Sequence, residues 1–165
     1  AVPKTWKKIH EGDMFVFRSP APARRALFAP EARAAGSDEV LAAAQAPGFD
    51  PAATVWLDDG PVAALERRAR GSARILEDGA NAVAVEVDSD GPGWLLLLDN
   101  WFPGWEATVN GAPVRVRRAD YAFRAVEVPG GRSRVVFVYR PLSFRLGYLL
   151  AFAAALALGA AFRRR

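Results

Sequence analysis

Short segments in which hydrophobic and polar residues alternate make up most of the chain, and this is the pattern of β-strands that bury one face. Residues 83–87 (Val-Ala-Val-Glu-Val) give the clearest example. Residues 94–98 are apolar on both faces, which predicts a central strand. Asn110-Gly111 predicts a tight hairpin turn, because both residues tolerate positive φ. Further strands are predicted within residues 6–19 (two strands about a turn at 11–13), 26–28, 54–57, 62–70, 105–109, 114–116, 121–126 and 135–139.

Many short strands at roughly ten-residue spacing, with glycine and proline turns, predict a mainly β domain of the β-sandwich or jelly-roll type. One short helix is predicted near residues 38–46, where Ser37 is a cap residue followed by two acidic residues, and Pro47-Gly48 ends the helix. The predicted core comprises Val85, Val87, Leu95, Leu97, Val109, Val126, Val136 and Val138.

Residues 146–162 contain no charged side chain and are followed by three arginines. As a helix this run would be about 25 Å long, against roughly 30 Å for the hydrocarbon core of a bilayer. The pattern predicts two parts, a β domain over residues 1–141 and a membrane segment over residues 142–165 that spans the bilayer at about 146–162. A buried helix of a soluble domain is the alternative, but it is disfavoured because no face of the helix carries a charge.

Small residues recur every fourth position in this predicted helix, at Gly147, Ala151, Ala155 and Gly159. Such a stripe lets helix backbones approach closely in lipid, so it predicts packing against other transmembrane helices. Chance placement in an alanine-rich helix is the alternative.

The charge of the chain is concentrated at its end. The net charge is +4, but the arginines at 163–165 account for three of these charges, and the rest of the chain is nearly neutral. This balance argues against a nucleic-acid partner, which would need a clustered basic face. Cysteine is absent, which excludes disulfides, thiolate metal sites and cysteine nucleophiles. Since the chain begins Ala-Val-Pro without an export signal, we expect it to be the C-terminal part of a longer protein.

Few residues suggest catalysis or metal binding. His10, the single histidine, falls in a predicted turn, and we interpret it as solvated. Asp88, Asp90 and Asp99 approach the spacing of a calcium loop, but Pro92 occupies a ligand position and the last position is Asp rather than Glu. We therefore predict no catalytic residue, no metal and no cofactor in this chain.

Arg115, Arg117 and Arg118 lie in and just after a predicted strand. The preferred interpretation is the solvent face of an edge strand. Contact with anionic lipid headgroups is the alternative, because each surface basic residue adds about 1 kcal/mol there.

Trp101, Phe102 and Trp105 form an aromatic corner with Pro103 and Gly104. Its aromatic rings either plug one end of the sandwich or form a platform for a sugar or lipid, since flat rings offer a large apolar area at low entropic cost. These three residues are the candidate ligand-binding residues.

Five short motifs follow one another over residues 99–147: Phe102-Pro103-Gly104-Trp105, Asn110-Gly111, Phe123-Arg124-Ala125-Val126, Pro129-Gly130-Gly131 and Tyr139-Arg140-Pro141. In this order and spacing they resemble the end of the YfhO-type family of bacterial membrane proteins. Upstream the similarity is thinner, because Ser19 stands where that family usually has Asn and Arg24 where it usually has Pro.

The resemblance implies a parent with many transmembrane helices, similar to C-type glycosyltransferases that take sugars from polyprenyl phosphates and modify cell-envelope polymers. The catalytic acids of such enzymes lie in early loops that have no counterpart here. The resemblance also implies a place in the bacterial cytoplasmic membrane, with residues 1–141 outside the cytoplasm. The expected partners are the bilayer, other helices of the parent and a glycan or lipid-linked sugar. A non-catalytic carbohydrate-binding domain and a purely structural anchored domain remain alternatives.

Overall fold

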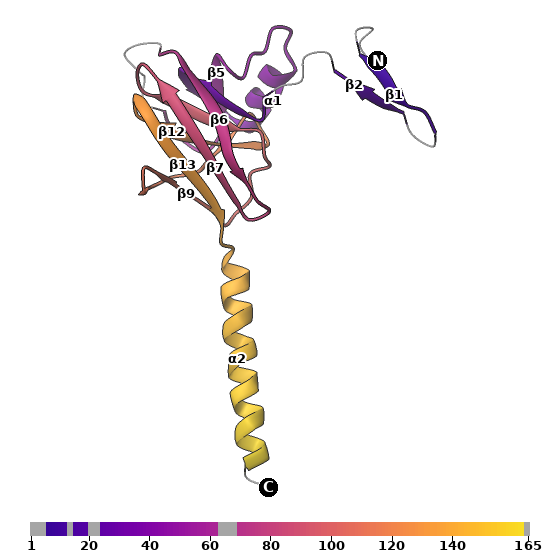
Figure 1. The fold of residues 1–165 in the computed structure, drawn as a ribbon, viewed down its shortest axis with the longest axis vertical. Coiled ribbons are helices and arrows are strands. Elements are labelled where there is room, and N and C mark those ends of the chain that lie inside the picture. Colours follow the sequence, from indigo (N-terminus) through magenta and orange to yellow (C-terminus); the bar gives the residue numbers. More distant parts are fainter. Residues whose placement is uncertain (1–5, 13–14, 20–23, 63–68, 164–165) are drawn as a thin grey trace.

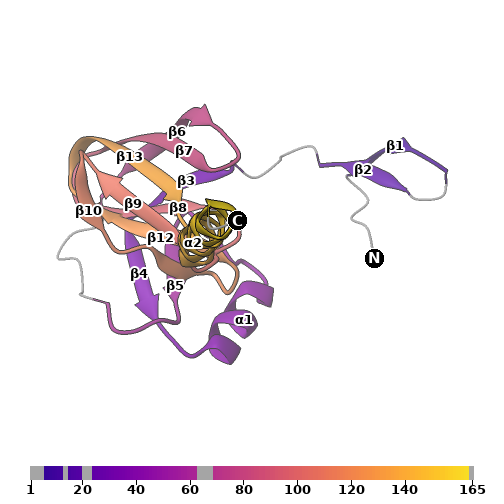
Figure 2. The same cartoon turned by 90° about the horizontal axis from the view of Figure 1, so that it is seen from below.

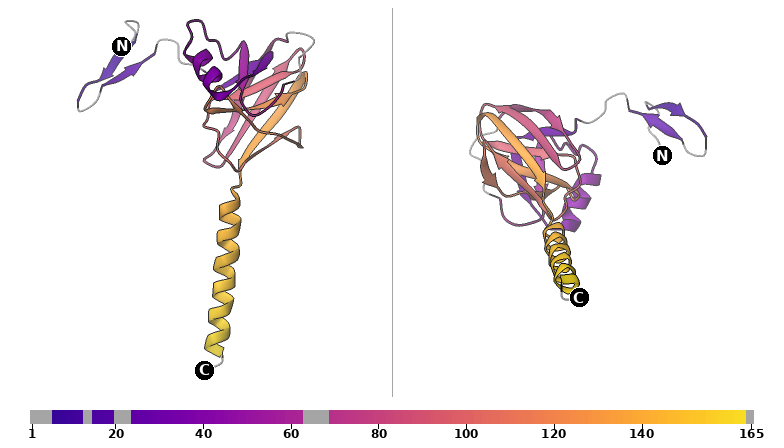
Figure 3. Two further views of the ribbon diagram at one scale, coloured as in Figure 1. Left: turned by 180° about the vertical axis from the view of Figure 1, so that it is seen from behind. Right: turned by 60° about the horizontal axis from the view of Figure 1, so that its bottom comes forward.

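The structure is a computed structural model. It describes residues 6–12, 15–19, 24–62 and 69–163, and for Val16, Arg145 and residues 157–162 it describes the backbone alone. A two-sheet β domain stands at one end of the long helix α2 (Leu142–Arg163), which projects away from it (Figure 1). A separate antiparallel hairpin, β1 (Lys7–His10) and β2 (Val16–Arg18), lies beside the β domain (Figures 1 and 3).

The first sheet has five antiparallel strands in the order β10-β9-β13-β7-β6. The long strand β13 pairs with β7 on one side and with β9 on the other, so it is hydrogen-bonded along both edges. The Asn110-Gly111 turn has positive φ at both residues, as predicted, and joins β9 to β10. The strands are β6 (Gly71–Asp78), β7 (Ala82–Ser89), β9 (Trp105–Val109), β10 (Ala112–Val114) and β13 (Gly131–Tyr139).

The second sheet has six strands in the order β3-β8-β12-β11-β5-β4. Its first five strands pair antiparallel, whereas β4 pairs parallel to β5. A parallel pair needs a crossover, and the helix α1 (Ser37–Gln45) lies in that connection. The strands are β3 (Ala26–Ala29), β4 (Glu31–Ala34), β5 (Thr54–Leu57), β8 (Gly93–Leu97), β11 (Arg117–Ala119) and β12 (Phe123–Val128).

The main core lies between the two sheets, and a second apolar cluster lies on the other face of the six-stranded sheet. Strand β8 contributes to both, since Leu95 and Leu97 face the main core while Trp94 and Leu96 face the second cluster. The prediction of a central strand here is confirmed. Six predicted core residues are buried: Val85, Val87, Leu95, Leu97, Val109 and Val126.

The predicted core positions in β13 are wrong. Val136 and Val138 are only partly buried, whereas Val135 and Phe137 are fully buried. Residues 135–139 are apolar at every position, so the alternation could not show which face is inward. The register decides it, because Val135 lies opposite Val85 and Val109.

The sequence predicted most elements but missed three strands, β4, β6 and β11, whose residues lack clear alternation. The strand predicted within residues 62–70 falls mostly on 63–68, which lie outside the described residues. Helix α1 is confirmed, but its cap is not Ser37. Gly36 occupies the cap position, and the Ser37 hydroxyl donates instead to Asp58 Oδ2 at 2.9 Å.

Two residues separate the end of β13 from the start of α2, and Figure 2 shows the helix end-on beneath the β domain. Within the part of the chain that the structure describes, no helix combines the length and apolar character needed to cross a membrane. The assignment of residues 146–162 to a transmembrane span stays a prediction from the sequence.

Candidate functional site

The aromatic corner (residues 101–105) connects β8 to β9 at the end of the β domain from which α2 leaves. The backbone N–H of Trp101 donates to the carbonyl of Ala122 at 2.7 Å, which fixes the start of the corner. The Phe102 side chain is 62% exposed, so its ring is open to solvent. Trp105 is partly buried and begins β9.

The corner is joined to the junction (residues 139–141), the segment that links β13 to α2. The backbone N–H of Arg140 donates to the carbonyl of Gly104 at 2.7 Å. Gly104 has φ +107°, and a Cβ at this position would lie 2.8 Å from Pro141 Cα. Only glycine allows both this conformation and this close backbone approach. The base of α2 is therefore attached directly to the corner.

Arg124, on β12, contacts Trp105 at the end of the corner and Asp99 two residues before its start. Its guanidinium lies 3.5 Å from the ring centroid of Trp105, and Nη2 donates to Asp99 Oδ2 at 2.6 Å. The Trp105 ring in turn lies 5.2 Å from that of Tyr139 in the junction. Because Arg124 is only 2% exposed, its charge is removed from water and depends on these neighbours.

A second arginine completes this ion cluster. Arg25 donates to Asp99 through Nε at 2.6 Å and Nη2 at 2.9 Å, and to Asp78 through Nη1 at 2.5 Å. The hydrogen bonds from Arg25 hold the pKa of Asp99 below its usual range against the opposing effect of burial. Burial lowers the pKa of Arg124, although Asp99 partly compensates. Asp99 is thus an ionised acceptor shared by two arginines.

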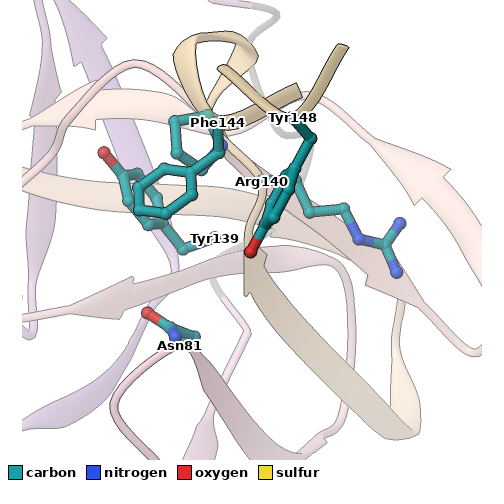
Figure 4. A pocket seen from close by; sticks show the side chains of 6 residues that line it. Asn81, Tyr139, Arg140, Phe144 and Tyr148 are labelled. Atoms are coloured by element: carbon teal, nitrogen blue, oxygen red, sulfur yellow. The ribbon is translucent and has the colours of Figure 1, made fainter. Parts of the chain in front are cut away.

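A cavity of about 300 Å³ lies where α2 leaves the β domain. Tyr139, Pro141, Phe144 and Tyr148 supply most of its apolar lining, and Asn81 and Arg140 add polar groups. Figure 4 shows the Asn81 amide on one side of the space and the rings of Phe144 and Tyr148 on the other. The Asn81 carbonyl accepts a hydrogen bond from the Tyr139 N–H at 2.9 Å, so the turn between β6 and β7 is also attached to the junction.

The segment that forms this site is the part of the chain that matches a known family. A family described as bacterial membrane protein YfhO matches residues 63–151, just over half of the chain, including β6 to β13, the corner and the start of α2. The chain belongs to the YfhO family. No curated protein and no solved structure matches it.

This YfhO-family domain brings the three candidate ligand-binding residues to one corner but gives them different surroundings. Phe102 offers an open ring, Trp101 is partly buried, and Trp105 has Arg124 on its ring and Tyr139 beside it. A ligand therefore meets Phe102 more readily than Trp105. Their role in binding stays a prediction.

The small-residue stripe lies along α2 in the YfhO-family chain. Gly147, Ala151 and Ala155 are exposed, and the surroundings of Gly159 lie outside the described residues. No other described element covers the stripe at Gly147, where a Cβ would meet nothing within 4 Å. Packing against further helices stays a prediction.

The interpretation of Arg117 and Arg118 as the solvent face of an edge strand is wrong. Strand β11 lies inside the six-stranded sheet, between β12 and β5. Arg117 is buried and donates to Asp59 Oδ1 at 2.6 Å, and Arg118 donates to Asp58. Burial would raise the pKa of Asp58, but the hydrogen bonds from Arg118 and Ser37 outweigh it and lower the pKa. Arg118 stays partly exposed beside its partner, and Arg115 is exposed and pairs with Asp59 at 3.1 Å.

Sequence reasoning missed the ion cluster of the YfhO-family domain. Arg124 lies among apolar residues in β12, whose one other charged residue is Glu127, and a charged residue in such a strand is a signal for a buried partner. Asp99 lies two residues before the corner, and the sequence draws attention to it only through the spacing of a calcium loop. In the structure it accepts from Arg25 and Arg124, Asp88 pairs with Arg132, and Asp90 Oδ1 accepts from the Arg70 N–H. Among the described residues, no three acidic or histidine side chains gather around a common point.

Proposed function

We propose that this chain is an accessory domain and membrane anchor of a longer, multi-spanning bacterial membrane protein. In this proposal residues 146–162 of α2 span the cytoplasmic membrane, the β domain lies on the extracytoplasmic side, and the arginines at 163–165 lie in the cytoplasm. The uncharged run of 17 residues and the basic cluster after it support the span and its direction. Membership of a bacterial membrane protein family supports the location.

The observation that carries the proposal is the rigid attachment of the corner to the base of α2. The Arg140–Gly104 hydrogen bond and the close packing of Gly104 on Pro141 leave no flexible linker between the β domain and the helix. A domain that only has to be retained at the membrane could be joined to its helix by a flexible linker. A domain that must keep a fixed position over a helical bundle needs a rigid attachment.

The proposed parent is a glycosyltransferase that takes sugars from polyprenyl phosphates and modifies cell-envelope polymers. The sequence resemblance supports this activity. The β domain would position donor or acceptor beside the bundle, and catalysis would depend on residues of the parent. The open ring of Phe102 favours the second candidate function, a carbohydrate-binding domain without catalysis. Glycan binding by the full chain that is lost in Phe102→Ala would support that candidate, and absence of glycan binding would favour a purely structural domain.

The orientation can be tested by cysteine labelling, because the natural chain contains no cysteine. In intact cells, a membrane-impermeant maleimide should label Arg74→Cys on the exposed edge strand β6 and should not label a cysteine added after residue 165. After permeabilisation both positions should react. Labelling of the added cysteine in intact cells would contradict the proposed orientation, and failure of the chain to remain in membranes washed with alkaline carbonate would contradict the span.

The small-residue stripe is proposed as the face of α2 that packs against other helices of the parent. In lipid, close backbone approach replaces the hydrophobic effect as the source of packing energy. Gly159→Leu and Ala155→Leu should therefore weaken assembly of the parent, whereas Leu149→Ile should leave it unchanged. Cysteines at 155 and 159 should crosslink to other helices. Crosslinks from 149 or 152 with none from the stripe would show that another face is used.

A further inference from the structure

The cavity at the junction combines an aromatic lining with polar groups at its edge. Tyr139, Phe144 and Tyr148 supply the rings, and the Phe144 and Tyr148 rings, one helical turn apart, lie 6.4 Å from each other. Phe144 and Tyr148 are each more than half exposed, so the cavity opens towards the surroundings of α2. Asn81 supplies an amide, and Arg140 also lines the cavity, with its guanidinium on the far side of the Tyr148 ring from Asn81 (Figure 4).

The position of the cavity along the chain fixes its depth, given the proposed span. Pro141 precedes Leu146, the first residue of the uncharged run, by five residues, which is about 7.5 Å along a helix. Each headgroup layer of a bilayer is about 5–8 Å thick. The cavity therefore lies in the headgroup layer, with Phe144 and Tyr148 at its boundary with the hydrocarbon core. Tyrosine and other aromatic residues are enriched at this depth.

Arg140 is the cation that lines the cavity, and its ion pair with Glu106 is weak. Its Nη1 lies 3.3 Å from Glu106 Oε2, and both side chains are more than half exposed. An exposed pair of this kind contributes little in water. A phosphate arriving from the bilayer can therefore take the guanidinium without breaking a strong ion pair, and it would form a charge-assisted hydrogen bond.

We propose that this cavity binds the headgroup of an anionic phospholipid, with the phosphate on Arg140, the polar headgroup beside Asn81, and the first part of the acyl chains against Phe144 and Tyr148. The proposal rests on the proposed span of residues 146–162. The chemistry combines one cation, one amide and a wall of aromatic rings, which matches a ligand with an anionic centre and an apolar tail. The bound lipid fills the space between the β domain and the helix.

The test is a lipid titration of the full chain in detergent micelles, read by native mass spectrometry. Dioleoyl phosphatidylglycerol and dioleoyl phosphatidylcholine are the two probes, and the occupancy of the first bound lipid is measured. Since one surface cation contributes about 1 kcal/mol towards an anionic lipid, phosphatidylglycerol should bind about fivefold more tightly than phosphatidylcholine. Arg140→Gln should abolish this preference.

Two matched controls make the result specific to the cavity. Arg134, on β13, is 55% exposed and pairs with Glu77, much as Arg140 is 57% exposed and pairs with Glu106, but it does not line the cavity. Arg134→Gln should keep the preference. Phe144→Ala should weaken binding of both lipids, whereas Phe152→Ala should not, although both rings are similarly exposed at 64% and 66%.

Equal binding of the two lipids by the natural chain would overturn the proposal, as would equal effects of the two arginine variants or of the two phenylalanine variants. The span is judged separately by resistance to carbonate extraction. A chain that resists extraction but shows no lipid preference keeps the anchor and loses the lipid site. A chain that is extracted loses the anchor on which the site rests.

Discussion

Replacing Asp99 with alanine should lower the free energy of unfolding of the β domain by about 3–5 kcal/mol, because it leaves a buried charge without its partner. Arg124 is almost fully buried, and its Nε has no hydrogen-bond partner in the described structure, so Asp99 is its main counter-charge. Arg25 would lose two hydrogen bonds at the same time. Chemical denaturation monitored by tryptophan fluorescence measures the change.

Asp88→Ala is the matched control for this prediction. Asp88 pairs with Arg132 at 3.6 Å, and both side chains are mostly exposed, so the loss of this pair should cost less than about 1 kcal/mol.

The destabilisation caused by Asp99→Ala should also depend on pH. Since the pKa of Asp99 is lowered by folding, its contribution is complete above the ordinary carboxyl range and disappears as pH falls through the lowered value. An Asp99→Ala effect no larger than that of Asp88→Ala would show that the cluster adds no stability.

Replacing Asp120 with asparagine should raise the stability of the domain at neutral pH. Asp120 is 5% exposed, its Oδ1 accepts from the Trp56 N–H at 2.8 Å, and its Oδ2 has no partner within the described structure. Burial raises the pKa of Asp120 to about 6, against an ordinary value of 3.8. Asparagine keeps the acceptor, removes the buried charge and suits the positive φ of 46° at this position.

Asp120 binds its proton more tightly in the folded state than in the unfolded state, and this sets the sign of the pH dependence of stability. Between the ordinary value and about pH 6 the folded wild type is protonated while the unfolded chain is not, so stability falls as pH rises. The stability difference between Asp120→Asn and wild type should therefore be near zero below pH 4. It should grow to about 3 kcal/mol above pH 6, since each pKa unit corresponds to 1.36 kcal/mol.

Denaturant titrations of both proteins from pH 3.5 to 8 measure this difference directly. Taking the difference removes the effects of other carboxylates, such as Asp58 and Asp99, whose lowered pKa values act in the opposite direction. Asp88→Asn, at an exposed position, should show no comparable rise. A flat difference curve for Asp120→Asn would mean that the buried carboxyl finds a partner, such as an ordered water.

The sequence predicted the class of fold because the relevant signals are local. Alternation, the Asn110-Gly111 turn and the apolar run at 94–98 each specify one element, and each is found where expected. What it could not predict depends on pairing between distant strands. Strand β4 is stabilised by its parallel partner β5 through a crossover, and Arg117 is buried because β11 lies between two other strands. Neither arrangement is visible in a window of ten residues.

The candidate site shows the same division. The aromatic residues of the corner could be selected as candidates from their residue type alone. The differences in their exposure could not be predicted, because Arg124 and Tyr139 contact Trp105 from other strands. The cavity was missed for a similar reason. Its lining comes from the turn after β6, the end of β13 and the first two turns of α2.

The short connection between β13 and α2 has a mechanical consequence. Only Arg140 and Pro141 separate the strand from the helix, and β13 is hydrogen-bonded to β7 and β9 along both edges. A force on the helix is therefore transmitted through these two residues to β13 and to its hydrogen bonds with β7 and β9. Under the proposed span, a tilt of the helix, which averages about 20° for spanning helices, would swing the β domain with it. The height and angle of the sandwich above the bilayer would then report the tilt of a single helix.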